Sequence, residues 1–212
     1  FSLVLTAEGH LYSFGFNVFG QLGLGHTNDV NVPQRVHGFD DVVTSVSAGT
    51  HHSAAITTGG RLWCWGWGYQ GRLGHGDNTD RTRPTAVASP AQMTVKLVAA
   101  GYMCTLLVDA DDAIWMTGRL CWGGPSSTTF TRVQIPGTPS RPPLRFAAVC
   151  MGSCHALAVT TDGGMFTWGE GDHGALGHGT TEHNDVPTEV HALKNTHVIK
   201  AAAAYSTSLV LT

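Results

Sequence analysis

The chain repeats itself about every 51 residues, and this regularity limits the possible folds more than any other feature. Four segments share an apolar pattern that ends in a glycine, and these glycines stand 51, 52 and 51 residues apart: Gly15, Gly66, Gly118 and Gly169. A short apolar run precedes each segment, and a fifth such run occupies residues 208–212. A fixed period of this length is typical of proteins that stack copies of one supersecondary unit.

Each unit predicts short strands rather than helices. In the second unit, residues 42–48, 53–57 and 61–65 read as strands, and a glycine pair at 59–60 indicates a hairpin turn. The last of these strands is apolar on both faces, which is typical of a sheet covered on both sides. We therefore predict an all-β fold of β-propeller blades, with about four repeats in a partial or incomplete ring.

Composition excludes several classes of function. Lys and Arg total 12 against 15 Asp and Glu, a formal charge of −3, so the surplus of basic residues that non-specific nucleic-acid binding needs is absent. We see no apolar run of membrane-spanning length and no signal peptide. The 5 cysteines are irregularly spaced, which favours a reducing compartment, cytoplasm or nucleus. Because the sequence starts at Phe1 inside a strand-like run, we expect it to belong to a longer protein.

A multi-part motif gives the chain a family resemblance. The second unit reads GTHHSAAIT at 49–57, LWCWG at 62–66, GRLGHG at 71–76 and P-x-x-V at 84–87, and the first and fourth units match it closely. This pattern resembles the regulator of chromosome condensation repeat and covers residues 1–212, which we expect to form a single propeller region. Members of this family form seven-bladed propellers, so the resemblance implies a fragment or an incomplete ring.

The resemblance leaves the function open between two classes. The founding member is a nucleotide-exchange factor for a small nuclear GTPase, and related propellers are interaction domains of HECT-type ubiquitin ligases or a plant ultraviolet photoreceptor. We predict a non-enzymatic protein–protein interaction scaffold within a larger regulatory protein; the alternative is exchange activity on a small Ran-like GTPase. Light sensing is disfavoured, because the Gly-Trp-Arg-His-Thr motif of the photoreceptor is replaced by GTHHS at 49–53. No membrane or nucleic-acid partner is expected.

The third unit departs from the pattern between Gly118 and Arg145. Only 15 residues separate Gly118 from Val133, against 21 between the equivalent positions of the other units, and the G-Q-L-G-x-G element is missing. Four arginines fall in or next to this degenerate stretch: Arg119, Arg132, Arg141 and Arg145. One interpretation is a decayed blade with solvated arginines. The other is a partner-contact surface, and on it we take these four arginines as candidate partner-binding residues.

Two further motifs suggest chemistry but favour architecture. A G-x-G-x-x-G fingerprint occurs at 66–71 and 169–174, yet each copy runs into another glycine turn instead of the helix that phosphate binding requires. We therefore predict no cofactor. The 63–77 stretch, WCWGWGYQGRLGHGD, is interpreted as a strand whose aromatic residues pack between blades, followed by a glycine turn. Gly71 and Gly74 are expected to adopt turn conformations that a β-branched residue cannot adopt without strain.

The histidines are predicted to be structural. His26, His75 and His178 follow glycine turns on different units, so they are poor candidates for one metal shell. We expect each to hydrogen-bond local backbone, and we extend this reading to the His51–His52 pair and His155. With no recognisable catalytic grouping either, we predict no catalytic or metal site.

Overall fold

The computed structural model describes residues 1–88, 93–121, 124–136 and 143–212, and its strands form five antiparallel sheets. Three of these sheets have four strands in sequence order, which we name blades 2, 3 and 4; the first and last sheets, blades 1 and 5, have three and two. Blade 1 contains β1 (Ser2–Leu5), β2 (Leu11–Gly15) and β3 (Val30–Arg35); blade 2 contains β4 (Val43–Ala48), β5 (His52–Thr57), β6 (Leu62–Gly66) and β7 (Arg81–Ala86); blade 3 contains β8 (Val95–Ala100), β9 (Cys104–Asp109), β10 (Ile114–Gly118) and β11 (Ser127–Arg132); blade 4 contains β12 (Phe146–Met151), β13 (His155–Thr160), β14 (Met165–Gly169) and β15 (Asn184–Glu189); blade 5 contains β16 (Lys200–Ala204) and β17 (Thr207–Leu211).

Helical structure in the described residues is limited to single 3-10 turns. These are η1 (Tyr69–Gly71), η2 (Asp172–Gly174) and η3 (His191–Leu193). The predicted all-β class is therefore confirmed, and no helix in the described part of the chain has the length and apolar character that crossing a bilayer requires.

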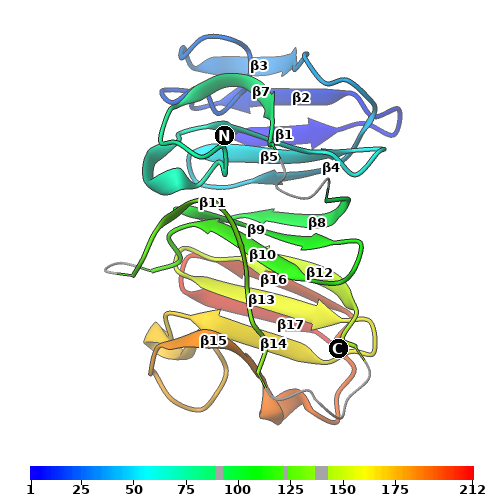
Figure 1. The fold of residues 1–212 in the computed structure, drawn as a ribbon, viewed down its shortest axis with the longest axis vertical. Helices are drawn as coiled ribbons and strands as arrows, with labels where there is room; N and C mark the ends of the chain where they lie inside the picture. The colour runs from blue at the N-terminus through cyan, green and yellow to red at the C-terminus, as the bar shows by residue number, and fades with distance from the viewer. Residues whose placement is uncertain (89–92, 122–123, 137–142) are drawn as a thin grey trace.

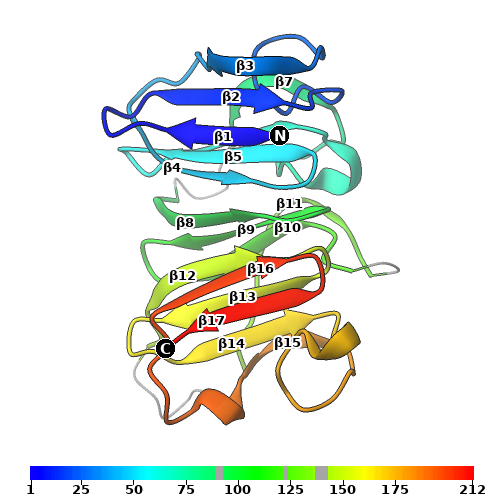
Figure 2. The same cartoon turned by 180° about the vertical axis from the view of Figure 1, so that it is seen from behind.

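The blades follow one another along an open arc. The first strands of successive blades, β4, β8, β12 and β16, contact one another, and their C-terminal ends line a common cavity. Blade 1 and blade 5 lie apart in both views, so the arc does not close on itself (Figures 1 and 2). This arrangement confirms the predicted propeller architecture in an incomplete ring.

The hydrophobic core lies between the blades. Every residue of β5 and β6 is buried, and the same is true of β13 and β14. Between blades 2 and 3, for example, Leu62 and Cys64 pack in one cluster with Leu107 and Phe130. The two-faced apolar pattern of the third strand thus reflects a sheet that is covered by a neighbour on each side.

The four glycines that mark the repeat end β2, β6, β10 and β14, each at a β-bulge. The register of β6 with β7 shifts between Cys64 and Gly66, and Gly66 has φ of 103°. A Cβ at this position would lie 2.7 Å from the carbonyl oxygen of His51, so a side chain would collide with backbone. Positive φ and close backbone approach together require glycine here.

Candidate functional site

Six rings from three blades meet at one end of the sheets and form what we call the aromatic surface. Its members are Phe16, Phe19, His51, Trp67, Tyr69 and Tyr102. Phe16 and Trp67 directly follow the bulge glycines of blades 1 and 2, whereas His51 and Tyr102 lie in the turns between first and second strands. The bulge brings these two kinds of segment together, because Trp67 N–H donates to the His51 carbonyl at 2.9 Å.

The rings pack in a layered arrangement around Trp67. Phe19 stacks on Trp67 with a centroid distance of 4.5 Å and an interplanar angle of 18°, and Tyr69 stacks on it at 5.3 Å and 17°. His51 meets Trp67 edge-on at 5.4 Å. At the margins Phe16 and Tyr69 remain 42% and 48% exposed, so the surface offers two large accessible rings on a firmly packed base.

A buried arginine lies beneath this surface. Arg72 is 0% exposed, and its Cζ lies 4.2 Å from the Trp67 ring centroid. Its Nε donates to the Tyr69 carbonyl at 2.9 Å and its Nη1 to the Tyr102 carbonyl at 2.6 Å, while Nη2 has no partner among the described residues. Burial lowers the pKa of Arg72 to about 10, so the group still carries its charge at neutral pH. Burial first, and then this charge, lower the pKa of His51.

The four candidate arginines do not form one surface. Arg119 lies at the same end as Arg72: its N–H donates to the Met103 carbonyl at 2.9 Å, and a Cβ on Gly118 would lie 3.1 Å from the Arg72 Cα. Arg132 pairs with Trp115 at the opposite end of blade 3, and Arg145 directly precedes β12 at that same end. Arg141 lies outside the described residues. Their role in partner binding stays a prediction.

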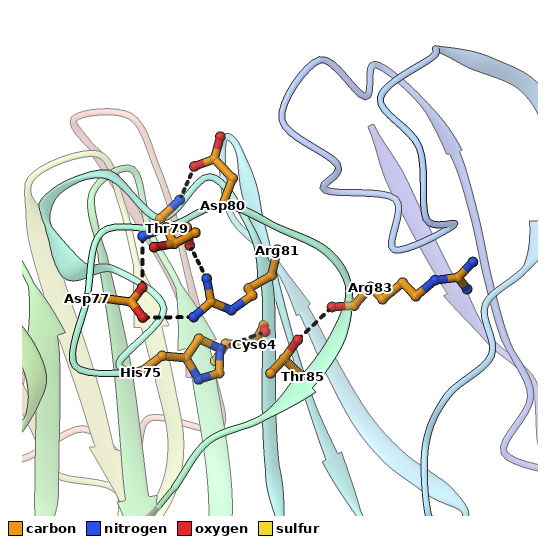
Figure 3. Close-up of polar contacts among 9 residues, drawn as sticks. Cys64, His75, Asp77, Thr79, Asp80, Arg81, Arg83 and Thr85 are labelled. Atoms are coloured by element: carbon orange, nitrogen blue, oxygen red, sulfur yellow. Dashed lines mark hydrogen bonds and ion pairs between the residues drawn. The ribbon is translucent and has the colours of Figure 1, made fainter.

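Two of the three histidines that follow glycine turns hydrogen-bond local backbone, as predicted. His75 Nε2 donates to the Cys64 carbonyl at 3.1 Å, and Asn28 N–H donates to His26 Nδ1 at 3.2 Å. His178 instead contacts a side chain, the Thr167 hydroxyl, at 3.0 Å. Figure 3 shows His75 beneath the exposed Asp77–Arg81 ion pair, whose atoms are 2.8 Å apart. Solvent screening makes such a pair a minor contribution to stability.

On the opposite side of this turn, Arg83 extends away from Arg81 toward blade 1 (Figure 3). A Cβ on Gly25 would lie 2.4 Å from Arg83 Nη2, and Gly25 N–H donates to the Thr82 carbonyl at 2.8 Å. The glycine turn of blade 1 therefore packs on the outer strand of blade 2, and the turn of blade 2 packs in the same way on blade 3, where a Cβ on Gly71 would lie 2.5 Å from the Thr128 Cα.

The local-backbone prediction is wrong for His52 and His155, because both bridge neighbouring blades. His52 Nε2 lies 2.8 Å from the Thr105 hydroxyl, which donates to the Arg72 carbonyl at 2.7 Å. His155 likewise lies 3.0 Å from the Ser208 hydroxyl, which donates to the Ala175 carbonyl at 2.8 Å. We call each of these histidine–hydroxyl–carbonyl links a clamp; in each clamp the histidine and the hydroxyl residue are 53 positions apart. Such a partner in the next unit cannot be read from one unit alone.

The clamp makes His52 a neutral histidine. Because the Thr105 hydroxyl hydrogen goes to a carbonyl, His52 Nε2 must be the donor, and its Nδ1 is buried without a partner in the described residues. Protonating Nδ1 would place an unpaired charge in the interior, and burial accordingly lowers the pKa of His52 well below its usual value.

We therefore expect the protein to lose stability in mild acid. Below about pH 6.5, His52 becomes protonated in the unfolded chain but stays neutral in the folded protein. The free energy of unfolding therefore falls by up to about 1.4 kcal/mol for each pH unit below this value, and the contribution of His52 is constant above it. Thermal melts from about pH 7.5 to about pH 5 measure this slope. His52→Gln should flatten it, and equal slopes for variant and wild type would contradict the assignment.

The contact between blades 3 and 4 lacks this clamp altogether. Cys104 replaces the histidine, Ala156 replaces the hydroxyl residue, and the loop that would carry the carbonyl is the element missing from the third unit. Cys104 and Ala156 instead pack in an apolar cluster with Leu120 and Trp168. The indole N–H of Trp168 is left as a buried donor without a partner in the described residues. The equivalent Trp65 Nε1 donates to the Gln21 carbonyl at 2.9 Å.

Sequence reasoning did not find the aromatic surface. It interpreted residues 63–77 as a strand whose aromatic residues pack between blades, followed by a glycine turn, and the packing holds for Trp63 and Trp65, which are buried. Trp67 and Tyr69 lie beyond the bulge at Gly66, where the chain leaves the strand and turns to the end of the blade. Gly66 was the available signal in the sequence, because a β-bulge ends the alternation of side chains that places strand residues between blades.

Comparison with known proteins decides the family. The model of the regulator of chromosome condensation (RCC1) repeat matches residues 8–56, 59–108 and 162–211, which together exceed half of the chain. The chain belongs to the RCC1 repeat family. A second model of the same repeat matches residues 43–72 and 146–175, so residues 109–145, which contain the degenerate stretch, match neither model.

Individual RCC1 relatives differ in what they do. The chain is 33% identical to the Arabidopsis thaliana Ultraviolet-B receptor UVR8 over 99% of its own length and 48% of the receptor. It is 35% identical to the human E3 ubiquitin-protein ligase HERC2, covering 99% of this chain and 4% of the ligase. A mouse Secretion-regulating guanine nucleotide exchange factor is 32% identical over 80% of this chain and 37% of that protein.

A solved structure supports the same fold. Human WBSCR16 superposes with a TM-score of 0.90 over 99% of this chain and 55% of that one, at 23% identity. The chain thus spans about half or less of the relatives and structures named here, and its similarity to them describes the repeat fold they share.

Proposed function

We propose that residues 1–212 form one propeller region that binds a protein partner, without catalytic activity of its own, within a larger regulatory protein. The observation that carries this proposal is the aromatic surface, where exposed Phe16 and Tyr69 stand on rings packed across three blades. Aromatic residues are enriched at protein interfaces because they bury much area at little cost in conformational entropy.

Two observations support the setting of this function. The similarity to HERC2 covers only 4% of that ligase, as expected if such a region serves as an interaction module inside a large enzyme. The five cysteines are free thiols, three of them buried, which is consistent with a reducing cytoplasmic or nuclear compartment.

Replacing the two exposed rings tests the proposal. Phe16→Ser combined with Tyr69→Ser should abolish capture of a specific partner from cell extract, and titration with that purified partner should show binding at least about tenfold weaker. Val32→Ser is the matched control, since Val32 is also exposed but lies on the outer strand of blade 1. If every captured protein binds the double variant as well as wild type, the aromatic surface is not the binding site.

Exchange activity on a small GTPase is the second candidate. The 32% identity to the mouse exchange factor favours it. The resemblance implies that the founding member displaces the nucleotide with an inserted β-hairpin. All the described strands here belong to the five blade sheets, so the described residues contain no such inserted hairpin. Release of a fluorescent guanine nucleotide from a panel of small GTPases measures this activity. We expect no acceleration; acceleration by the purified chain would establish exchange in place of simple binding.

A further inference from the structure

We propose that the aromatic surface takes an acidic segment of its protein partner, with carboxylates held at the Arg72–Arg119 end of the surface and an apolar side chain on the exposed rings. This inference rests on the proposed binding function and specifies the chemistry of the partner. It depends on charge, burial and ring geometry at the contact between blades 2 and 3.

The first support is the uncompensated charge of Arg72. No ion pair of the described residues includes it, and its Nη2 is buried without a partner. The one carboxylate that raises the pKa of Arg72 belongs to Asp80, whose Oδ1 already accepts the Gly68 N–H at 2.8 Å. A buried cation without a carboxylate partner is costly, and an anion arriving from a partner would offset that cost.

The second support is Arg119, a second arginine that is less deeply buried than Arg72. Arg119 is half-buried, and its Nε is a buried atom with no partner among the described residues. Its backbone and the Arg72 guanidinium both hydrogen-bond the same turn, at Met103 and Tyr102 respectively. Arg72 is too deeply buried to touch a ligand, so it supplies a positive field while Arg119 supplies the direct contact.

The third support is the position of the rings. Trp67 covers Arg72, and the exposed Tyr69 stacks on Trp67. An apolar side chain seated on Tyr69 or Phe16 would exclude water beside the arginines, and this exclusion strengthens a carboxylate–guanidinium interaction.

Two other ligands fit less well. A cationic group on the rings would be repelled by Arg72, whose charge already lowers the pKa of His51. A nucleic acid would need a series of basic residues along its phosphates, whereas the protein has a net charge of −3 and blade 4 places Glu170 and Asp172 at this same end. The positive region is therefore confined to blades 2 and 3, a size that suits one or two carboxylates.

Fluorescence polarisation with defined probes tests the inference. The probe is a short labelled peptide of alternating glutamate and phenylalanine, compared with matched peptides in which glutamine replaces glutamate or alanine replaces phenylalanine. We expect the acidic aromatic peptide to bind about tenfold or more tightly than either matched peptide, with an affinity that falls as salt is added.

Two arginine variants localise the effect. Arg119→Gln should weaken binding of the acidic peptide by about tenfold and leave binding of the glutamine peptide unchanged. Arg35→Gln is the matched control and should change neither, since Arg35 is exposed and pairs with Tyr12 at the opposite end of blade 1. Equal binding of the glutamate and glutamine peptides, or tighter binding of a single-stranded oligonucleotide that Arg119→Gln abolishes, would overturn the inference. If the Phe16/Tyr69 double variant still loses its partner in that case, the proposed binding function stands by itself.

Discussion

Gly71→Val is expected to lower the free energy of unfolding by about 3 kcal/mol or more, measured by urea denaturation. Gly71 has φ of +74°, which a β-branched residue adopts only with strain. A Cβ there would also lie 2.3 Å from the Ser127 carbonyl oxygen and 2.5 Å from the Thr128 Cα, both on the outer strand of blade 3. The substitution therefore strains its own turn and separates two blades.

Gly174 is a matched control for this prediction. It occupies the equivalent place in blade 4 with φ of +76°, but a Cβ there meets nothing within 4 Å. Gly174→Val should therefore lose only the conformational part, about 1–2 kcal/mol. If the two variants are equally destabilised, contact between the turn and the next blade contributes nothing, and backbone conformation alone explains the glycine.

Trp65→Ala is the second substitution with a large expected effect, about 3–5 kcal/mol of unfolding free energy. Trp65 is 0% exposed and packs in the cluster between blades 1 and 2, next to Leu11 and Val36. Its Nε1 donates to the Gln21 carbonyl of blade 1, which also accepts the Ser53 hydroxyl at 2.7 Å. The truncation would remove both a large apolar contact and a hydrogen bond between blades.

The conservative change to phenylalanine separates the two contributions. Trp65→Phe keeps most of the ring but loses the bond to Gln21, so it should cost about 1–3 kcal/mol. Trp168→Phe removes an indole N–H that has no partner in the described residues, and that relief should leave it closer to neutral. Thermal or urea melts of the two variants make the comparison. A larger loss at Trp168 than at Trp65 would show that its N–H is satisfied in solution.

The degenerate third unit changes more than its own loop. Its missing element would have supplied a carbonyl to blade 4, and the position that donates a hydroxyl in blade 2, Ser53, is Ala156 in blade 4. Cys104 replaces the bridging histidine at the same contact. Replacing donors together with the acceptor limits the cost, because a buried donor without an acceptor is what costs free energy; Trp168 Nε1 is the donor that remains without a partner in the described residues. Blades 3 and 4 therefore pack through apolar groups.

Much of the fold could be predicted from the sequence because each blade is a local unit. Three features can be recognised from one repeat and from their recurrence along the chain: the bulge glycines, the strand at 62–66 that is apolar on both faces, and the turn glycine Gly71. The candidate arginines show the limit of this reasoning. They are close in sequence, yet the blade places Arg119 at one end and Arg132 and Arg145 at the other, since an outer strand runs the full length of the sheet between them.

The sequence by itself determined the repeat, its strands and the family, because those depend on spacing within about 51 residues. Only the tertiary structure decided which residues meet across blades. His52 hydrogen-bonds Thr105 in the next blade, and Arg72 donates to the Tyr102 carbonyl 30 residues away. The aromatic surface likewise brings together rings from three successive units. The physical reason is that a blade buries its faces only against its neighbours, so contacts that bind or clamp arise where two units are brought together by packing.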